Sequence, residues 1–240
     1  MSRTHENPAG MSVLPSPSAL DRTGHPSLRA AIHDALRIEI LEGRLEPGNL
    51  LRIKDLQSRF GVSASVVREA LCQLASRGLV LAEEQRGFRV APVSAVDLED
   101  VTRSRAELEE FTIRDAIANG DVEWESRLLA AFHKLVRLPK RSAAYASEHQ
   151  AFHDLLVAPC RSEWMKRFRK TLQEHSDRYR RLATNHNDDG RDIDGEHREL
   201  MNAALDRDAD RAALLISEHV RRTARILARH GLTTADRQPE

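Results

Sequence analysis

Residues 56–71, LQSRFGVSASVVREAL, indicate the fold of the N-terminal part of the chain. Leu56 and Phe60 lie four positions apart, which places both on one face of a short helix, and Gly61 marks a tight turn after it. Ser63 follows as a candidate N-cap for a second helix with apolar residues at helical spacing. Two short helices joined by such a turn predict a helix-turn-helix, which presents its second helix to the major groove of DNA.

The sequence on either side extends this unit. Residues 1–26 are rich in Ser, Pro, Gly and His and read as a disordered arm. Apolar residues at helical spacing then predict a helix over 28–41. After the helix-turn-helix, two β-prone runs at 79–82 and 88–91 flank a short charged segment. Three helices and a hairpin make a winged helix-turn-helix, which we expect to span residues 27–93.

The predicted recognition helix carries polar side chains in its first two turns. Arg68 suits guanine or phosphate because its planar guanidinium forms bidentate pairs. At the predicted wing tip, Gly87 lets the backbone approach the minor groove and Arg86 can enter it. A solvated helix face and an ordinary hairpin turn are the alternatives, but the combination of turn and hairpin favours DNA. The candidate DNA-contacting residues are Lys54, Ser63, Ser65, Arg68, Arg86 and Gly87.

Residues 94–232 are helical in pattern almost throughout. Apolar periodicity and Asp/Gly-rich breaks predict six helices, near residues 95–118, 122–136, 142–158, 163–182, 194–206 and 208–230. We expect these helices to form an all-α bundle, followed by a tail at 233–240. The predicted fold class is therefore mainly α, with an N-terminal winged helix-turn-helix and a C-terminal all-α six-helix bundle.

Composition restricts the class of protein without deciding it. Lys+Arg and Asp+Glu both number 37, so any DNA-binding surface must come from local arrangement of charge. There is no apolar run of about 18 residues and no secretion signal, so we expect a soluble cytoplasmic protein that binds no membrane. Cys72 and Cys160 form no CxxC pair and are expected to be small buried thiols, with neither a disulfide nor a cysteine metal site.

Histidines supply the candidate metal ligands. His149 and His153 lie four apart on an apolar helical stripe, and such a pair can bind one metal ion. His197 and His219 lie beside apolar residues on two later helices, so all four imidazoles could converge in the bundle. The predicted cofactor is a divalent metal ion, with zinc as the first candidate and nickel or another transition metal as alternatives. The competing interpretation of each histidine is a hydrogen-bonded core residue.

The chain resembles the FadR subfamily of the GntR family of bacterial regulators. Residues 27–93 are similar to the family's DNA-binding domain, above all at GVSASVVREAL and RGFRVAP, and residues 95–230 resemble the FCD-type C-terminal domain. The resemblance implies a homodimer that binds double-stranded operator DNA and responds to a small carboxylate effector. Ala64 and Val66 stand where the family usually has Arg and Pro, so the resemblance does not carry over the operator sequence.

The resemblance also bears on the metal ligands. Metal-binding FCD domains use an Asp-x-x-x-His pair and two later histidines, and His153, His197 and His219 match three of these ligands. His149 occupies the aspartate position. A neutral imidazole there leaves the charge of a divalent ion uncompensated, which favours an anionic ligand; weaker metal binding or none is the alternative. Glu148 lies about 100° around the helix and is a poor substitute.

Two further residues are candidates for effector binding. Arg105 falls at the spacing of a buried helix face, where a guanidinium needs a partner. In the motif RAELE it matches the family arginine that faces the effector cavity, so the resemblance implies a pair with an effector carboxylate. An internal pair with Glu109 or another acid is the alternative. His175 shares a helical stripe with Trp164 and Phe168, and is either a pocket residue or a hydrogen-bonded core residue.

These observations predict a metabolite-responsive transcriptional regulator and not an enzyme. The preferred mechanism is a repressor that leaves its operator when a small organic acid binds near the metal; activation is the less common logic in the family. A regulator for which the metal itself is the signal is one alternative. A metal-dependent hydrolase is the other, but the sequence contains no HExxH motif and no evident inward general base.

Overall fold

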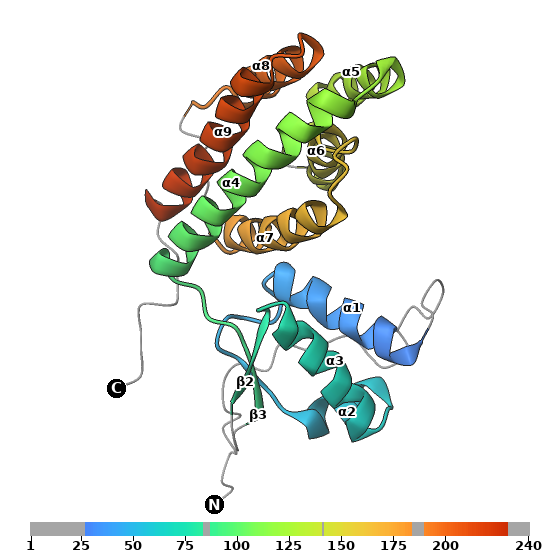
Figure 1. Cartoon of the computed structure of the whole chain (residues 1–240). Helices are drawn as coiled ribbons and strands as arrows, with labels where there is room; N and C mark the ends of the chain where they lie inside the picture. The colour runs from blue at the N-terminus through green and yellow to red at the C-terminus, as the bar shows by residue number, and fades with distance from the viewer. Residues whose placement is uncertain (1–26, 84–86, 141, 184–189, 230–240) are drawn as a thin grey trace, which may run out of the picture. The chain divides into compact units, whose positions relative to one another are not determined.

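The computed structural model describes residues 27–83, 87–140, 142–183 and 190–229. It confirms the mainly α fold, and the chain divides into two compact units, Met1–Pro92 and Val93–Glu240 (Figure 1). Each unit has its own cluster of buried apolar side chains. The expected N-terminal arm, the C-terminal tail and the predicted wing-tip residue Arg86 lie outside the described residues.

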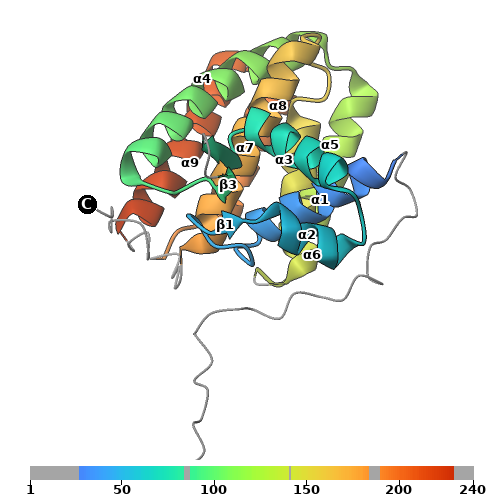
Figure 2. The same cartoon turned by 90° about the horizontal axis from the view of Figure 1, so that it is seen from below.

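The first unit is a winged helix-turn-helix. In chain order its described elements are α1 (Leu28–Leu41), β1 (Leu50–Leu51), α2 (Ile53–Phe60), α3 (Ala64–Ser76), β2 (Val80–Glu83) and β3 (Gly87–Val90). The described strands form an antiparallel sheet in the order β1-β3-β2, with β1 beside β3 (Figure 2). The sequence did not predict β1, because two residues are too few to show a periodicity.

The turn between α2 and α3 follows from a single glycine. Gly61 has φ +66°, in the left-handed region that glycine adopts without steric cost, and its N–H closes α2 by donating to Gln57 O at 2.8 Å. Behind the turn, Leu71 and Leu74 of α3 are fully buried against α1. Each such leucine stabilises the fold by about 1.5–3 kcal/mol. The turn and this core fix the direction of α3.

A buried ion pair also ties α2 to α1. Arg59 Nη1 donates to Glu39 Oε2 at 2.9 Å, and both side chains are nearly inaccessible to water. Removing one partner of such a pair leaves an uncompensated charge, which typically costs about 3–5 kcal/mol. The pair therefore holds the first helix of the helix-turn-helix in place.

The second unit is helical throughout its described part. The long helix α4 packs along α9 and α7, and α5 packs against α6 and α8 (Figure 1). Side-chain caps start the helices where the sequence places them; for example, Ser94 accepts from Asp97 N, and Asp121 from Trp124 N. The six helices of this part are α4 (Ala95–Asn119), α5 (Val122–Val136), α6 (Ala143–Leu156), α7 (Glu163–Leu182), α8 (Ile193–Leu205) and α9 (Ala209–Arg229). No described helix is long and apolar enough to cross a membrane.

Two predictions about burial were wrong. Cys72 is exposed, because it lies on the outer face of α3, whereas Cys160 is buried as expected. Trp164 and Phe168 were expected to face inward, but they are 66% and 53% exposed and stack on each other, with ring centroids 5.9 Å apart. Polar residues occupy the buried face of α7 instead, including Arg169, because α4 and α6 supply their partners.

Candidate functional site

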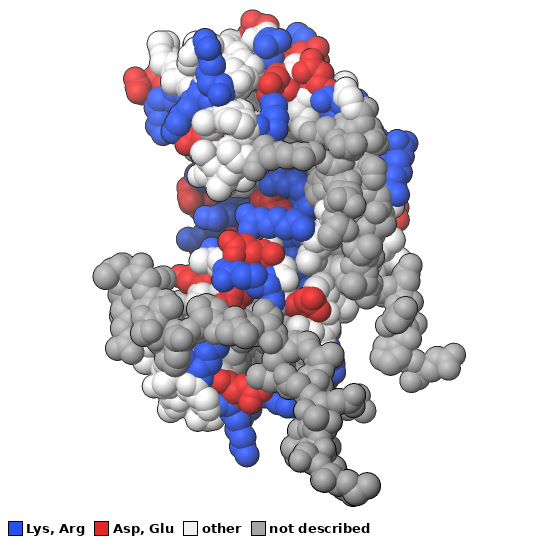
Figure 3. Space-filling view, turned by 180° about the vertical axis from the view of Figure 1, so that it is seen from behind, with Lys and Arg blue, Asp and Glu red and all other residues white. Residues whose placement is uncertain are grey.

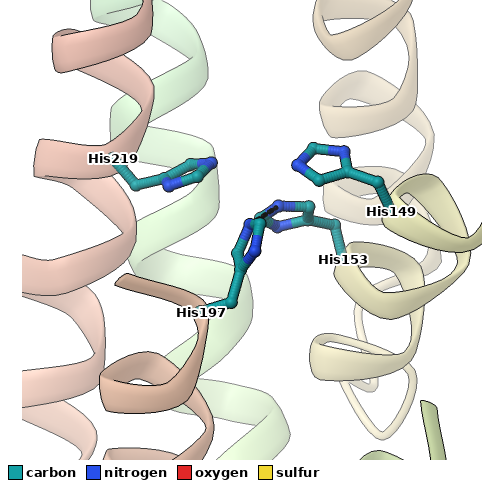
Figure 4. Close-up of side chains that lie close together, drawn as sticks. All are labelled: His149, His153, His197 and His219. Carbon is teal, nitrogen blue, oxygen red and sulfur yellow. Dashed lines mark hydrogen bonds between the residues drawn. The ribbon is translucent and has the colours of Figure 1, made fainter. Parts of the chain in front are cut away.

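Four histidines from three helices converge inside the second unit. His149 and His153 come from α6, His197 from α8 and His219 from α9 (Figure 4). One ring nitrogen from each lies within 4.8 Å of the corresponding atom of every other. His149 is half-buried and the other three are buried. We call this group the four-histidine cluster.

One pair inside the cluster has the spacing of two ligands around one ion. The Nε2 atoms of His153 and His197 lie 3.2 Å apart. Zinc–nitrogen bonds of about 2.0–2.1 Å imply a ligand separation of about 3.3 Å at a tetrahedral centre. The Nδ1 atoms of both rings are buried without a hydrogen-bond partner among the described residues. Two imidazoles placed in this way fit a shared metal ion better than they fit an ordinary core.

The electrostatics of the cluster keep the imidazoles neutral. Burial, and after it the neighbouring histidines, lower the pKa of His153 well below its ordinary value. Burial, together with the nearby imidazole of His219, lowers the pKa of His197 to about 2. Burial also lowers the pKa of His149 and His219. Neutral rings have the free lone pair that a metal requires. Since the cluster contains no carboxylate among its described members, it suits zinc, nickel or copper rather than magnesium or calcium.

Arg105 lies beside the cluster in a shared ion pair. Its Nε donates to Glu109 Oε1 at 3.2 Å, so the internal pair considered from the sequence is present. However, Glu109 Oε2 also accepts from Arg169 Nε at 2.7 Å, and one carboxylate therefore serves two guanidinium groups. Burial lowers the pKa of Arg105, and its charge in turn helps to lower the pKa of His153. Among the described residues, the terminal nitrogens of Arg105 have no hydrogen-bond partner.

Arg169 and Glu196 are two residues that the sequence analysis missed. Arg169 donates to Asp154 Oδ1 and to the carbonyl oxygen of His153, both at 2.9 Å, and so joins α7 to the helix that carries two of the cluster histidines. Glu196 accepts from His219 Nδ1 at 2.9 Å. The position of Glu196 directly before His197 was the available signal, but nothing local indicated that it faces α9.

His175 is not brought into the cluster. It is partly buried on α7 and lies outside the group of four histidines whose ligand atoms converge. Trp164 and Phe168, which were expected to share its inward stripe, are exposed. The role of His175 as a pocket residue stays a prediction.

The described DNA-binding candidates are exposed on the first unit. Lys54 lies at the start of α2, Arg68 in the second turn of α3, and Gly87 opens β3 with φ +95°. Ser63 stands at the N-cap position, but its hydroxyl bonds Ser65 Oγ at 2.9 Å instead of capping a backbone N–H. On the face drawn in Figure 3, basic and acidic side chains are interspersed, in keeping with the net formal charge of +0.

The winged helix-turn-helix and the helical unit with its histidine cluster define the class of protein. The chain belongs to the gntR family of bacterial regulatory proteins, whose model matches residues 28–90, and carries an FCD domain that matches residues 100–222. It is a DNA-binding transcriptional regulator.

Individual relatives agree with this assignment. The chain is 38% identical over 214 residues to the uncharacterized HTH-type transcriptional regulator BphR of Paraburkholderia xenovorans, covering 86% of this chain and 87% of BphR. It is 34% identical over 198 residues to the HTH-type transcriptional repressor GlaR of Escherichia coli, covering 77% of this chain and 89% of GlaR. The solved structure of E. coli McbR/YncC superposes with a TM-score of 0.71 at 21% identity, over 85% of this chain and 99% of McbR. At that identity the superposition shows the fold alone.

Proposed function

We propose that this regulator is a repressor, and that a small organic acid releases it from its operator by binding at the four-histidine cluster and Arg105. The observation that carries the proposal is the convergence of four neutral imidazoles beside a buried arginine that shares its carboxylate with a second arginine. The name of GlaR, a transcriptional repressor, supports the direction of the response.

The cluster residues would hold the metal ion. His149, His153, His197 and His219 are the ligands, and zinc, or nickel in its place, matches their nitrogen donors. When bound, the ion supplies a positive charge that attracts a carboxylate oxygen. The terminal nitrogens of Arg105 would take the same carboxylate as a bidentate pair. His175 stays a candidate for the outer part of this pocket.

The DNA contacts would come from the exposed residues of the first unit. Arg68, with Ser63 and Ser65, would reach base edges or phosphates in the major groove, and Lys54 the backbone. Gly87 with Arg86 would approach the minor groove. A homodimer would place two recognition helices on a palindromic operator. We assign the dimer interface to the surface of the helical unit that carries the stacked, exposed Trp164 and Phe168.

A metal-dependent hydrolase finds no support in the surroundings of the cluster. Glu148 is bound to Lys134, and Asp154 accepts from Arg169 and Gln150. The two carboxylates that flank the His149 and His153 pair are therefore engaged in contacts with neighbouring side chains.

The testing experiment measures operator affinity as a function of metal and acid. Protein purified without a histidine tag is loaded with zinc, its operator is selected from random duplexes, and affinity is followed by fluorescence anisotropy with a panel of hydroxy and dicarboxylic acids. We expect at least one acid to weaken binding in the zinc-loaded protein and to lose this effect after zinc removal. Release by zinc itself, with no effect of any acid, would establish a metal-responsive regulator and refute the proposal.

A further inference from the structure

Two side chains contact the Nδ1 atom of His219, and each contact requires a different protonation state of that atom. Glu196 Oε2 is 2.9 Å away and can only accept a proton, whereas Arg191 Nη2 is 3.2 Å away and can only donate one. If Nδ1 carries its proton, it donates to Glu196 and leaves the Nε2 lone pair free. If Arg191 donates to Nδ1, the proton must lie on Nε2, and Nε2 cannot bind a metal.

The other hydrogen bonds of Arg191 decide between these two states. Its Nε donates to Glu196 Oε1 at 2.8 Å, and its Nη1 to Thr223 Oγ1 at 2.9 Å. The two hydrogens of Nη2 have acceptors in Glu196 Oε2 and in the carbonyl oxygen of His219. The hydrogens of Arg191 therefore have acceptors other than Nδ1. We infer that Nδ1 of His219 carries the proton and donates it to Glu196.

The carboxylate of Glu196 is well held as an acceptor. Arg191 binds both of its oxygens, and Arg222 Nη1 donates to Oε1 at 2.9 Å. With arginine donors on both of its oxygens, the carboxylate of Glu196 acts as an acceptor toward Nδ1 of His219.

This arrangement singles out one ligand of the cluster. Among the described residues, His219 has a carboxylate partner for its second nitrogen, whereas the Nδ1 atoms of His153 and His197 have no partner. Glu196 directly precedes His197, so one turn of α8 supplies both a cluster ligand and the partner of the ligand on α9. Carboxylates of this kind fix the tautomer of a metal-binding histidine and raise its basicity.

We propose that Glu196 is a positioning residue, which fixes His219 as the Nδ1–H tautomer and so presents Nε2 to the metal site. The inference rests on the proposed metal site, but its central statement concerns the protein before metal binds. Because the tautomer can be read in metal-free protein, the failure of this inference is distinguishable from the failure of the metal site itself.

The first experiment is long-range proton–nitrogen NMR of metal-free protein labelled with ¹⁵N-histidine, in which the His219 signals are identified by their loss in His219→Gln. We expect a protonated Nδ1 and an unprotonated Nε2 in the unmodified protein. A proton on Nε2 would overturn the proposal without any further variant.

The second experiment compares three variants by the same spectra and by zinc affinity. Glu196→Ala removes the acceptor, so we expect Arg191 to donate to Nδ1, the tautomer to switch, and zinc affinity to fall about 10- to 100-fold. Glu196→Gln keeps an acceptor oxygen without the charge, and we expect it to retain the tautomer with a smaller loss of affinity. Glu148→Gln, which removes a carboxylate beside His149 that is bound to Lys134, should change neither.

The outcomes separate cleanly. An unchanged tautomer in folded Glu196→Ala, or a zinc affinity equal to that of Glu148→Gln, would overturn the role of Glu196. If Glu196→Ala does not fold, Glu196→Gln and the unmodified protein still decide the tautomer. If the unmodified protein has the predicted tautomer but takes up no zinc, the proposed metal site fails while the control of His219 by Glu196 stands.

Discussion

The Nε2 atoms of His153 and His197 lie 3.2 Å apart, although the residues are 44 positions apart in the chain and belong to different helices. Both side chains are buried, and both Nδ1 atoms lack a hydrogen-bond partner among the described residues. A buried polar atom without a partner costs about 1–3 kcal/mol. The protein therefore gives up stability to hold the two Nε2 atoms this close together.

Removal of this pair should abolish metal binding. We expect His153→Ala combined with His197→Ala to reduce the metal content from about one divalent ion per chain to none, because two of four ligands are lost. The measurement is mass spectrometry of untagged protein. His33→Ala, a histidine of the first unit bound to Asp34, is the control and should keep the full content. Metal retained by the double variant would place the site elsewhere.

Arg68→Ala should weaken operator binding by about tenfold or more, because a bidentate arginine contact is worth about 1–3 kcal/mol. Since Arg68 is exposed on α3, the midpoint of thermal unfolding should not change. Anisotropy titrations with the selected operator measure the effect. Arg77→Ala, at the far end of the same helix, is the matched control. Equal affinities of the two variants would remove Arg68 from the DNA interface.

Arg105→Ala should abolish the response to the acid and leave operator affinity in its absence unchanged. In the proposed function the guanidinium of Arg105, which acts electrostatically on His153 of the cluster, would pair with the carboxylate of the acid. Arg103→Ala provides the comparison, since Arg103 lies two residues earlier on α4, is exposed and binds Asp100. An acid response as strong in Arg105→Ala as in Arg103→Ala would refute the role of Arg105 in effector binding.

Glu109→Gln should lower the free energy of unfolding by about 3–5 kcal/mol at pH 7, because Arg105 and Arg169 lose their shared partner. Burial raises the pKa of Glu109, but the two arginines outweigh it, so the pKa lies below its ordinary value of 4.5. A carboxyl with a lowered pKa stabilises the fold above pH 4.5, and this stability is lost as the pH falls through the lowered value.

Urea denaturation at a series of pH values checks the sign. The difference in free energy of unfolding between the unmodified protein and Glu109→Gln should stay constant from pH 7 down to about 5. It should become smaller only below pH 4.5. Glu107→Gln, an exposed neighbour on α4, should show little difference at any pH. A difference in free energy of unfolding that already disappears near pH 6 would contradict the assigned direction of the pKa shift of Glu109.

On the proposal that the chain dimerises through the stacked Trp164 and Phe168, the double variant Trp164→Ser with Phe168→Ser should be monomeric, because it lacks the apolar area that the second copy would bury. Light scattering coupled to gel filtration measures the mass. Leu214→Ser is the control, since Leu214 is 67% exposed on α9 and is apolar. If the double variant and the control both stay dimeric, the interface lies on another surface.

The helices could be predicted from the sequence, because helix formation is local. Apolar residues three and four apart and Asp/Gly-rich breaks placed the ends of the six predicted helices of residues 94–232 within two residues of those observed. The turn at Gly61 was likewise readable from its neighbours. The spacing of His149 and His153, which places both on one helix face, was also readable from the local sequence.

Contacts between side chains of different helices could not be predicted from the sequence. Glu109 was predictable as a neighbour of Arg105 one turn away, but its sharing with Arg169, 60 residues later, depends on how α4 and α7 pack. The same packing leaves Trp164 exposed. An apolar stripe in the sequence does not show which surface covers it. Glu196 acquires its place beside His219 in the same way. Local periodicity fixes the helices, and the contacts between helices fix the chemistry.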